Sequence, residues 1–327
     1  MKAIICKQFG PIDQLTYEET QEPAVSTNSA KIRITACGVN FPDALLVQGL
    51  YQAKPPLPFI PGCEFAGVVD AVGDQVTHLK PGDRVLASSL QLGGFAEKAV
   101  IDSSQLFLLP DDISDQQAAA LPCAFGTAHH ALKQRAQLQS GETLLVLGAS
   151  GATGLAAVQI GKAMGATVIA ACSSDEKLKL AKSHGADHLI NYNNQNLAKS
   201  VKELTDRKGA DVIFDPIGGD AFDSCTHCIA WNGRLLVIGF ASGRIPTLEA
   251  NLALVKGFSV VGVFWGAFTQ HQPSTYQANM DELFGWLQSG DVTPYIDDLL
   301  PLSQAPQAMQ QIINRTVKGK LILTPDA

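Results

Sequence analysis

Apolar and polar residues alternate in two different ways along the chain. Up to about residue 120, short segments such as 30–36 and 65–73 alternate with a period near two, and turn residues separate them. That period is typical of half-buried strands. The first part of the chain is therefore predicted to be rich in strands and turns, and the turn 81–84 leads into one further strand.

From residue 116 the pattern changes. Residues 117–132 have a helical period, and from Gly141 onward short apolar runs alternate with helical segments. The predicted strands lie at 144–147, 167–172, 211–215 and 234–239. Strands that alternate with helices predict an α/β fold with a doubly wound parallel sheet. After about residue 265 a mixed segment follows, and it ends in a strand at 320–324.

Three glycines connect the first of these strands to its helix. Gly148, Gly151 and Gly154 stand where a Rossmann sheet binds a dinucleotide. Glycines let the backbone approach a pyrophosphate, and the free N–H groups of the helix start face its negative charge. A tight turn without a ligand is the alternative. The predicted cofactor contacts in this loop are Ser150, Gly151, Ala152 and Thr153.

The end of the second strand bears on the choice of cofactor. NAD sites place an acidic residue near this point, whereas this strand is followed by Ser173 and Ser174, with Lys177 shortly after. Hydroxyls and an ammonium suit the 2′-phosphate of NADPH. Asp175 keeps NADH open, and Ser174 can also act as a helix N-cap. The prediction is NADPH, bound in part by Ser173, Ser174 and Lys177.

Length and composition limit the remaining possibilities. A chain of 327 residues is long for one core, which favours two domains. The net charge of −7 argues against nucleic-acid binding and against anionic membranes, and no apolar run approaches the ~20 residues of a membrane span. The start of the chain reads as a strand rather than a signal segment. Seven cysteines do not suggest a disulfide framework. We expect a cytoplasmic protein.

The order of these parts, together with several short motifs, resembles the medium-chain dehydrogenase/reductase superfamily over essentially the whole chain. The motifs are 36–43 (ACGVNFPD), 61–64 (PGCE), Gly73, 81–84 (PGDR), 93–97 (GGFAE), the glycine loop and 319–323 (GKLIL). The resemblance implies a GroES-like β-rich catalytic domain at 1–120 and 266–327, with a Rossmann NADPH-binding domain at 121–265. Asn40, Asp43 and Gly49-Leu-Tyr51 resemble the zinc-free NADPH:quinone oxidoreductase, or zeta-crystallin-like, branch.

The zinc positions of alcohol dehydrogenases in this superfamily fall on Asn40, Cys63 and Cys123. Asn40 is a poor zinc ligand, and no cysteine cluster for a structural zinc is present at 88–94. We therefore predict no metal, although Cys63, Cys123 and Glu64 are expected to approach one another. Half-buried packing of the two cysteines is the simpler interpretation. The pair Cys225 and Cys228 is also interpreted as packing.

The resemblance implies further site residues. Tyr51 is predicted to line the catalytic site and to donate a hydrogen bond, or a proton, to the reduced acceptor. Asn40 is predicted to bond the substrate or the nicotinamide ribose, unless it only closes a turn. Asp43 is assigned to anchoring a helix, and His129 and His130 to structure. Additional predicted cofactor contacts are Tyr192, Gly239, Phe240, Val263, Phe264 and, for the 2′-phosphate, Arg315 or Lys320.

Three functions remain open from the sequence. Hydride transfer from NADPH to a quinone is the leading prediction, because a site without zinc needs an acceptor that spreads negative charge. Reduction of an enoyl or alkenal double bond uses the same chemistry. A crystallin-like binding protein that retains NADPH is the third possibility. We also expect a homodimer, because the apolar segment 258–264 reads as a strand at a sheet edge.

Overall fold

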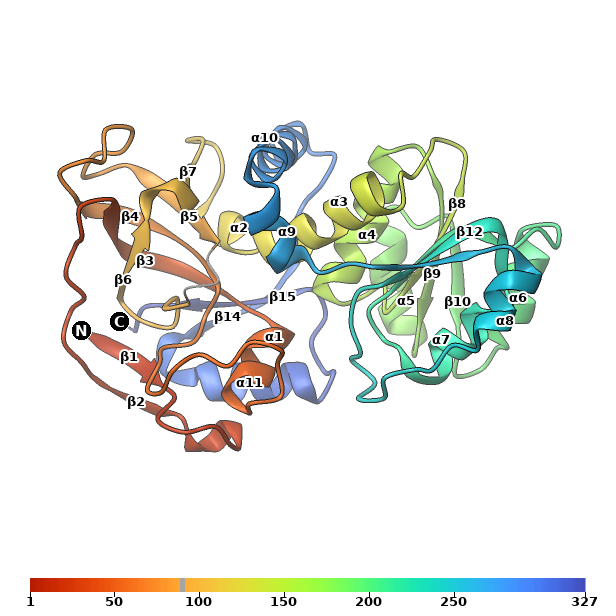
Figure 1. Cartoon of the computed structure of the whole chain (residues 1–327), viewed down its shortest axis with the longest axis horizontal. Helices are drawn as coiled ribbons and strands as arrows, with labels where there is room; N and C mark the ends of the chain where they lie inside the picture. Colours follow the sequence, from red (N-terminus) through yellow and green to blue (C-terminus); the bar gives the residue numbers. More distant parts are fainter. Residues whose placement is uncertain (89–91, 327) are drawn as a thin grey trace. The chain divides into compact units, whose positions relative to one another are not determined.

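The computed structural model describes residues 1–88 and 92–326 (Figure 1). The chain forms two compact units, one made of residues 1–123 and 296–327 and the other of residues 124–295. We call them the catalytic unit and the Rossmann unit, after the two domains that the sequence resemblance implies. Part of the segment 88–94, in which the structural-zinc cysteines are missing, lies outside the described residues.

The catalytic unit is built on antiparallel strands. Within the described residues, β14, β15, β3, β4, β5 and β7 form a sheet in that order, and β6 also pairs with β3. A separate antiparallel pair is made by β1 and β2. The strands are β1 (Lys2–Ile5), β2 (Thr16–Glu19), β3 (Ser29–Val39), β4 (Glu64–Val72), β5 (Arg84–Ser88), β6 (Lys98–Asp102), β7 (Leu106–Leu108), β14 (Ile296–Pro301) and β15 (Lys320–Thr324). The helices are α1 (Phe41–Val47), α2 (Asp115–Ala119) and α11 (Ala305–Ile313), with 3₁₀ turns at Ile12–Gln14, Ser103–Gln105 and Leu302–Gln304.

Alternation along these strands places one face in an apolar core. In β3, Ala30, Ile32 and Ile34 are buried, and the lysine and arginine between them are more exposed. Phe65, on β4, joins the same core cluster. The two ends of the chain meet in this sheet, because β15 pairs antiparallel with β3. That pairing brings Lys320 beside the segment that follows β3.

The Rossmann unit holds a parallel sheet. In the described residues its strand order is β10, β9, β8, β11, β12, β13. The bounds are β8 (Thr143–Leu147), β9 (Thr167–Cys172), β10 (His188–Asn191), β11 (Ala210–Asp215), β12 (Ile229–Val237) and β13 (Ser259–Gly262). The helices are α3 (Thr127–His130), α4 (Ala152–Ala163), α5 (Asp175–Ser183), α6 (Leu197–Leu204), α7 (Gly219–Cys225), α8 (Ala250–Lys256), α9 (Trp265–His271) and α10 (Pro273–Ser289). The strands follow the predicted α/β pattern closely, except that β12 begins five residues earlier and ends two residues earlier than the predicted strand 234–239.

Two predictions about element boundaries need correction. Residues 117–132 do not form one helix: α2 stops at Ala119, and a π-helical turn at Pro122–Gly126 precedes α3. Pro122 has no backbone N–H, which interrupts the regular hydrogen-bond pattern. A second π-helical turn follows at Ala131–Arg135.

The second correction concerns residues 266–295. We assigned them to the GroES-like domain, but they belong to the Rossmann unit. The reason is side-chain contact: Gln134 Nε2 donates to Asn279 on α10 at 2.9 Å, and His129 contacts both Glu282 and Trp286. His129 and His130 are buried and have structural partners, as assigned. Cys225 and Cys228 are also buried, as packing predicts.

Candidate functional site

The loop after β8 has the geometry that its glycines predict. Gly148 has φ +59°, a left-handed conformation that favours glycine. A Cβ at Gly154 would lie 2.2 Å from the carbonyl oxygen of Gly148, so only glycine permits this approach of helix to strand. At Gly151 the nearest such atom would be 3.6 Å away, and this residue is the N-cap of α4. The loop therefore presents the start of a 12-residue helix at the carboxyl end of β8.

The predicted loop contacts differ in exposure. Ser150 is buried, and its hydroxyl hydrogen-bonds to the thiol of Cys172 at the end of β9. Ala152 and Thr153 form the first, half-buried turn of α4. An anion placed here would meet backbone N–H groups and the positive end of the helix dipole.

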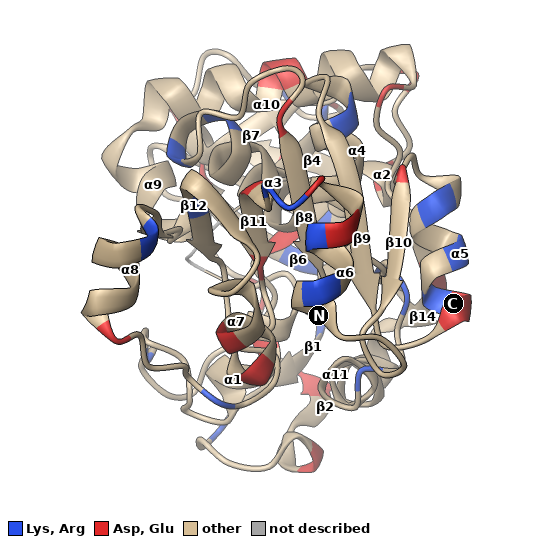
Figure 2. Ribbon diagram, turned by 90° about the vertical axis from the view of Figure 1, so that its right-hand side faces the viewer, with Lys and Arg blue, Asp and Glu red and all other residues tan. Residues whose placement is uncertain are grey.

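The segment after β9 combines a helix cap with basic charge. Ser174 accepts a hydrogen bond from the backbone of Lys177 at 3.4 Å, so it does cap α5. The carboxylate of Asp175 accepts a hydrogen bond from Asn191 Nδ2 at 2.7 Å, which ties it to the end of β10. Burial raises the pKa of Cys172, and the nearby Lys177 ammonium acts in the opposite direction. Lysines gather on α5 (Figure 2).

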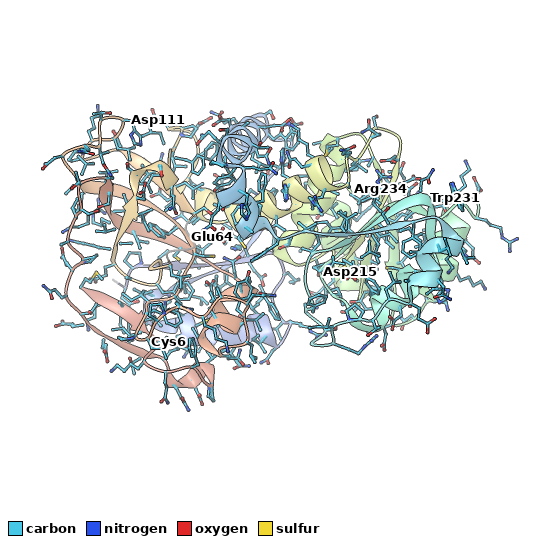
Figure 3. All side chains as sticks on the ribbon, viewed as in Figure 1. Cys6, Glu64, Asp111, Asp215, Trp231 and Arg234 are labelled. Atoms are coloured by element: carbon cyan, nitrogen blue, oxygen red, sulfur yellow. The ribbon has the colours of Figure 1, made fainter. Side chains whose placement is uncertain are left out.

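The loop after β11 is a part of this edge that sequence reasoning missed. The sheet reverses its strand order between β8 and β11, which is where ligands bind in doubly wound folds. Asp215 ends β11 (Figure 3) and accepts the backbone N–H groups of Ile217 and Gly218 at 2.8 and 2.9 Å. Burial raises the pKa of Asp215. A Cβ at Gly148 would contact Ile217, so the two loops are adjacent. An acidic strand end followed by Pro-Ile-Gly-Gly was the available signal.

Other predicted cofactor contacts also follow strand ends. Tyr192 comes directly after β10, and its N–H donates to Cys172 O at 3.1 Å. Gly239 and Phe240 follow β12, and Phe240 lies close to Gly218. Val263 and Phe264 follow β13 in the same way, with Val263 buried and Phe264 exposed. Arg315 is an exposed residue after α11 in the catalytic unit. The residues that follow β10, β12 and β13 share the carboxyl edge of the sheet. Their role toward a cofactor stays a prediction.

The catalytic unit contains a buried charged cluster. Lys320 at the start of β15 forms an ion pair with Glu64 at the start of β4, the residue labelled in Figure 3, and both side chains are almost fully buried. The Lys320 ammonium also donates to Asn40 Oδ1 at 2.5 Å. Burial lowers the Lys320 pKa, but the charges of Glu64 and Cys123 outweigh it, so the pKa is raised overall. The prediction that Lys320 reaches a 2′-phosphate is therefore wrong, because its ammonium is enclosed and paired.

Asn40 is fully engaged inside this cluster. Its Nδ2 donates to Glu64 Oε1 at 2.7 Å and to Cys63 Sγ at 3.6 Å. Its backbone N–H donates to Asp43 Oδ2 at 2.8 Å, so Asp43 anchors the start of α1 as assigned. Burial raises the pKa of Asp43 to about 7. Both amide hydrogens of Asn40 are used within the protein, which indicates a positioning role.

Gly38, which has no side chain, leaves room for the cluster. A Cβ at Gly38 would lie 2.4 Å from the carbonyl oxygen of Ala119, 2.5 Å from Glu64 Oε1 and 2.8 Å from Lys320 Cε. Glycine is therefore required in β3 beside the ion pair. The Glu64–Lys320 pairing was not predicted, since the partners are 256 positions apart in the chain.

Tyr51 and two cysteines border the cluster. Cys63 and Cys123 are both half-buried, and Glu64 Oε2 accepts the backbone N–H of Cys123 at 2.7 Å. The expected approach of Cys63, Cys123 and Glu64 is thus confirmed. Burial, together with the charges of Cys123, Cys63 and Asp43, raises the pKa of Tyr51 to about 12. The phenol therefore stays protonated near neutral pH and can act as a hydrogen-bond donor.

These residues do not fit a catalytic zinc. Asn40 directs an N–H group at Cys63, and the Lys320 ammonium lies within the same cluster. A donor hydrogen and a buried cation both oppose a second cation, and zinc needs S, N or O lone pairs. In the described part of the chain, no group of three or more His, Cys, Asp or Glu side chains has the arrangement of a metal site.

Comparison with known proteins agrees with this architecture. Residues 26–111 match the alcohol dehydrogenase GroES-like domain, and residues 152–285 match the zinc-binding dehydrogenase family. A quinone oxidoreductase-like protein 2 homolog of Nematostella vectensis is 41% identical over 98% of this chain and 88% of its own length. A quinone oxidoreductase of Pseudomonas aeruginosa is 36% identical over 99% of both chains. The chain belongs to the medium-chain dehydrogenase/reductase superfamily, in its quinone oxidoreductase branch.

A solved structure supports membership of this branch. The Escherichia coli quinone oxidoreductase complexed with NADPH has a TM-score of 0.93 and 28% identity, and the match covers 99% of this chain and 100% of the other. The predicted fold class, a GroES-like domain with a Rossmann sheet, is thereby confirmed. Among the described residues, no helix has the length and apolarity needed to cross a membrane.

Proposed function

We propose that this chain is an NADPH-dependent reductase that delivers hydride to a quinone. The observation that carries the proposal is the carboxyl edge of β8, β9 and β11. There a glycine loop, a helix start and a basic segment lie together at the point where strand order reverses. NADPH, when bound, supplies the hydride. Relatives named quinone oxidoreductase, one solved with NADPH, support the same choice.

Recognition of the 2′-phosphate is assigned to the segment after β9. Ser173, Ser174 and Lys177 offer hydroxyl and ammonium groups there, whereas the nearest carboxylate, Asp175, is bonded to Asn191. A carboxylate that is already engaged by an amide is less available to ribose hydroxyls. This arrangement favours NADPH over NADH. Arg315 stays a second candidate for the same phosphate.

On the acceptor side, Tyr51 is proposed as the hydrogen-bond donor. Its phenol keeps its proton near neutral pH, because its pKa is raised to about 12. A quinone that has gained hydride is an anion that such a donor stabilises. Asn40 is proposed to position Cys63 and Glu64 rather than to contact substrate.

The same phenol favours a second candidate function. Reduction of an α,β-unsaturated carbonyl needs a proton at carbon after hydride arrives, and a positioned acid accelerates that transfer. A hydroquinone anion takes its proton readily from water. An enoyl or alkenal reductase therefore depends more on Tyr51 than a quinone reductase does.

A homodimer is part of this proposal. Among the described strands, β13 is an edge of the Rossmann sheet. Near it, Trp231, Leu254 and Val255 are more than 70% exposed. The ring of Trp231 lies against Gly257, just before β13. An apolar edge of this kind is expected to pair with a second copy. Light scattering that shows a monomer at micromolar concentration contradicts the dimer.

A steady-state screen tests the function directly. The purified chain is assayed with NADPH and with NADH against a benzoquinone, a naphthoquinone, an alkenal and an enoyl thioester. The expected result is the highest kcat/KM for a quinone with NADPH. If kcat/KM is highest for the alkenal or the thioester, the result supports the second candidate, an enoyl or alkenal reductase. No turnover of any acceptor, with NADPH still bound in a fluorescence titration, supports a binding protein instead.

A further inference from the structure

Two cysteines of the catalytic unit lie side by side, although they are 60 positions apart in the sequence. The thiol of Cys63 hydrogen-bonds to Cys123, and Asn40 Nδ2 donates to Cys63 Sγ at 3.6 Å. Both residues are half-buried, whereas the other cysteines of the chain are buried. The proposed function gives these two thiols no chemical role.

The backbone around both thiols is held by one carboxylate. Glu64 directly follows Cys63, its Oε2 accepts the N–H of Cys123, and its Oε1 accepts from Asn40. Cys123 stands in the π-helical turn Pro122–Gly126, and such turns are frequent at functional sites. Because Glu64 is itself paired with Lys320, the two cysteine segments are fixed with respect to each other.

We propose that Cys63 and Cys123 form a reversible dithiol–disulfide pair that is oxidised by hydroperoxides. The Cys123 sulfur attacks a peroxide oxygen, the O–O bond breaks, and water leaves as Cys123 becomes a sulfenic acid. The Cys63 sulfur then attacks the Cys123 sulfur, the S–O bond breaks, and a second water leaves as the S–S bond forms. Two thiols lose two electrons and two protons, and hydrogen peroxide is reduced to two waters. An external dithiol reverses the oxidation.

The order of attack follows from the hydrogen bond between the thiols. The bond to Cys123, together with burial, raises the pKa of Cys63 well above its usual range. Cys63 therefore keeps its proton and donates it toward Cys123. The Lys320 ammonium also interacts electrostatically with Cys123. A thiol that keeps its proton is the poorer nucleophile, so Cys63 is the resolving residue and Cys123 the attacking one.

The Rossmann unit provides an internal comparison. Cys225 and Cys228 are hydrogen-bonded to each other as well, but both are fully buried in an apolar cluster. A peroxide has no access to them in the folded protein. Hydrogen bonding between thiols alone therefore predicts two reactive pairs, whereas exposure predicts only Cys63 and Cys123.

Peptide mapping of the full chain tests the pair. Reduced protein is treated with hydrogen peroxide, quenched with catalase, denatured and alkylated, and the peptides are identified by mass. The expected main oxidised product links Cys63 to Cys123, disappears with dithiothreitol, and leaves Cys225 and Cys228 alkylated. The proposal fails if the Cys63 and Cys123 peptides stay alkylated, if they reach only sulfinic acid, or if Cys225 and Cys228 oxidise equally.

Single substitutions test the assigned roles. In Cys63→Ser, the sulfenic acid on Cys123 should persist and be trapped by dimedone. In Cys123→Ser, dimedone labelling of Cys63 should be at least about tenfold weaker than the labelling of Cys123 in Cys63→Ser. Thermal melts of both variants confirm folding before treatment. The reverse labelling pattern, or no labelling in either folded variant, overturns the mechanism.

An activity assay links the pair to the proposed function, on which this last step rests. Because both cysteines act electrostatically on Tyr51, the disulfide should lower quinone reduction, and dithiothreitol should restore it. If the mapped disulfide forms but activity never responds, the regulatory step is wrong while the redox pair stands. If the chain has no reductase activity, the mapping experiment still decides on the pair.

Discussion

The two units build their sites from different materials. In the Rossmann unit, the proposed cofactor site is built from backbone: the left-handed Gly148, the close approach at Gly154 and the start of α4. In the catalytic unit, the candidate site is built around side chains, chiefly the buried ion pair of Glu64 and Lys320. A backbone site is formed by residues that are consecutive in the sequence, whereas a side-chain cluster is formed by residues that are far apart in it. The two should respond very differently to substitution.

The buried ion pair should be the most sensitive point. Lys320→Met leaves the Glu64 carboxylate without its cation in the interior, and breaking such a pair costs about 3–5 kcal/mol. Urea unfolding measures the loss. Adding Glu64→Gln to Lys320→Met should recover much of it, because no unpaired charge remains. A single variant as stable as the parent contradicts the buried pair.

Tyr51→Phe tests a side chain that borders the same cluster. Turnover of an enal should fall about 10²-fold, the range of general acid catalysis, whereas quinone turnover should fall only severalfold. The Kd for NADPH should hardly change. Tyr17→Phe serves as a control, since Tyr17 lies on β2 and is not part of the proposed site. Unchanged kcat for every acceptor shows that Tyr51 only packs.

Lys177→Ala tests the side-chain part of the Rossmann site. A charge-assisted contact is worth about 1.5–3 kcal/mol, so the Kd for NADPH should rise at least about tenfold. Binding of NADH should hardly change. Lys179→Ala is the matched control, because it removes the same charge from an exposed position of α5. Equal weakening by both variants indicates a general charge effect instead of a contact.

Substitutions at two glycines test the backbone part of the Rossmann site. Gly154→Ala places a Cβ against the carbonyl of Gly148 and should destabilise the chain by about 1–3 kcal/mol, as overpacking does. Gly151→Ala has ordinary space and should leave stability unchanged while it weakens NADPH binding. Thermal unfolding and fluorescence titration separate the two effects. Equal melting temperatures for both variants speak against the close approach.

The pH dependence of stability at Asp43 is a further test of the catalytic unit. Its pKa is raised to about 7 in the folded chain, above the value for an exposed aspartate. The folded state therefore retains this proton while the unfolded state releases it. Stability from this group is full below about pH 4 and is lost as the pH rises toward 7, by at most about 1.4 kcal/mol per pH unit. The difference in unfolding free energy between the parent and Asp43→Asn should show this slope, and a flat difference contradicts it.

Prediction from sequence succeeded where neighbours in the chain are neighbours in space. The glycine loop, the strands around it and the cap at Ser174 depend on local spacing. The predicted boundary at residue 265 failed, because α10 joins the Rossmann unit through distant contacts such as Gln134 with Asn279. Lys320 was assigned to phosphate binding, because its charge is visible in the sequence and its burial is not.

The sequence by itself determined the fold class, the family and the position of the glycine loop after β8. Those features follow from hydrophobic periodicity and from glycines whose role is local. Only the tertiary structure decided that Asn40, Glu64, Cys63, Cys123 and Lys320 form one cluster, since β15 returns beside β3 from the far end of the chain. A charge is costly to bury without a partner, and the partner becomes known only once the sheet has brought the two ends of the chain together.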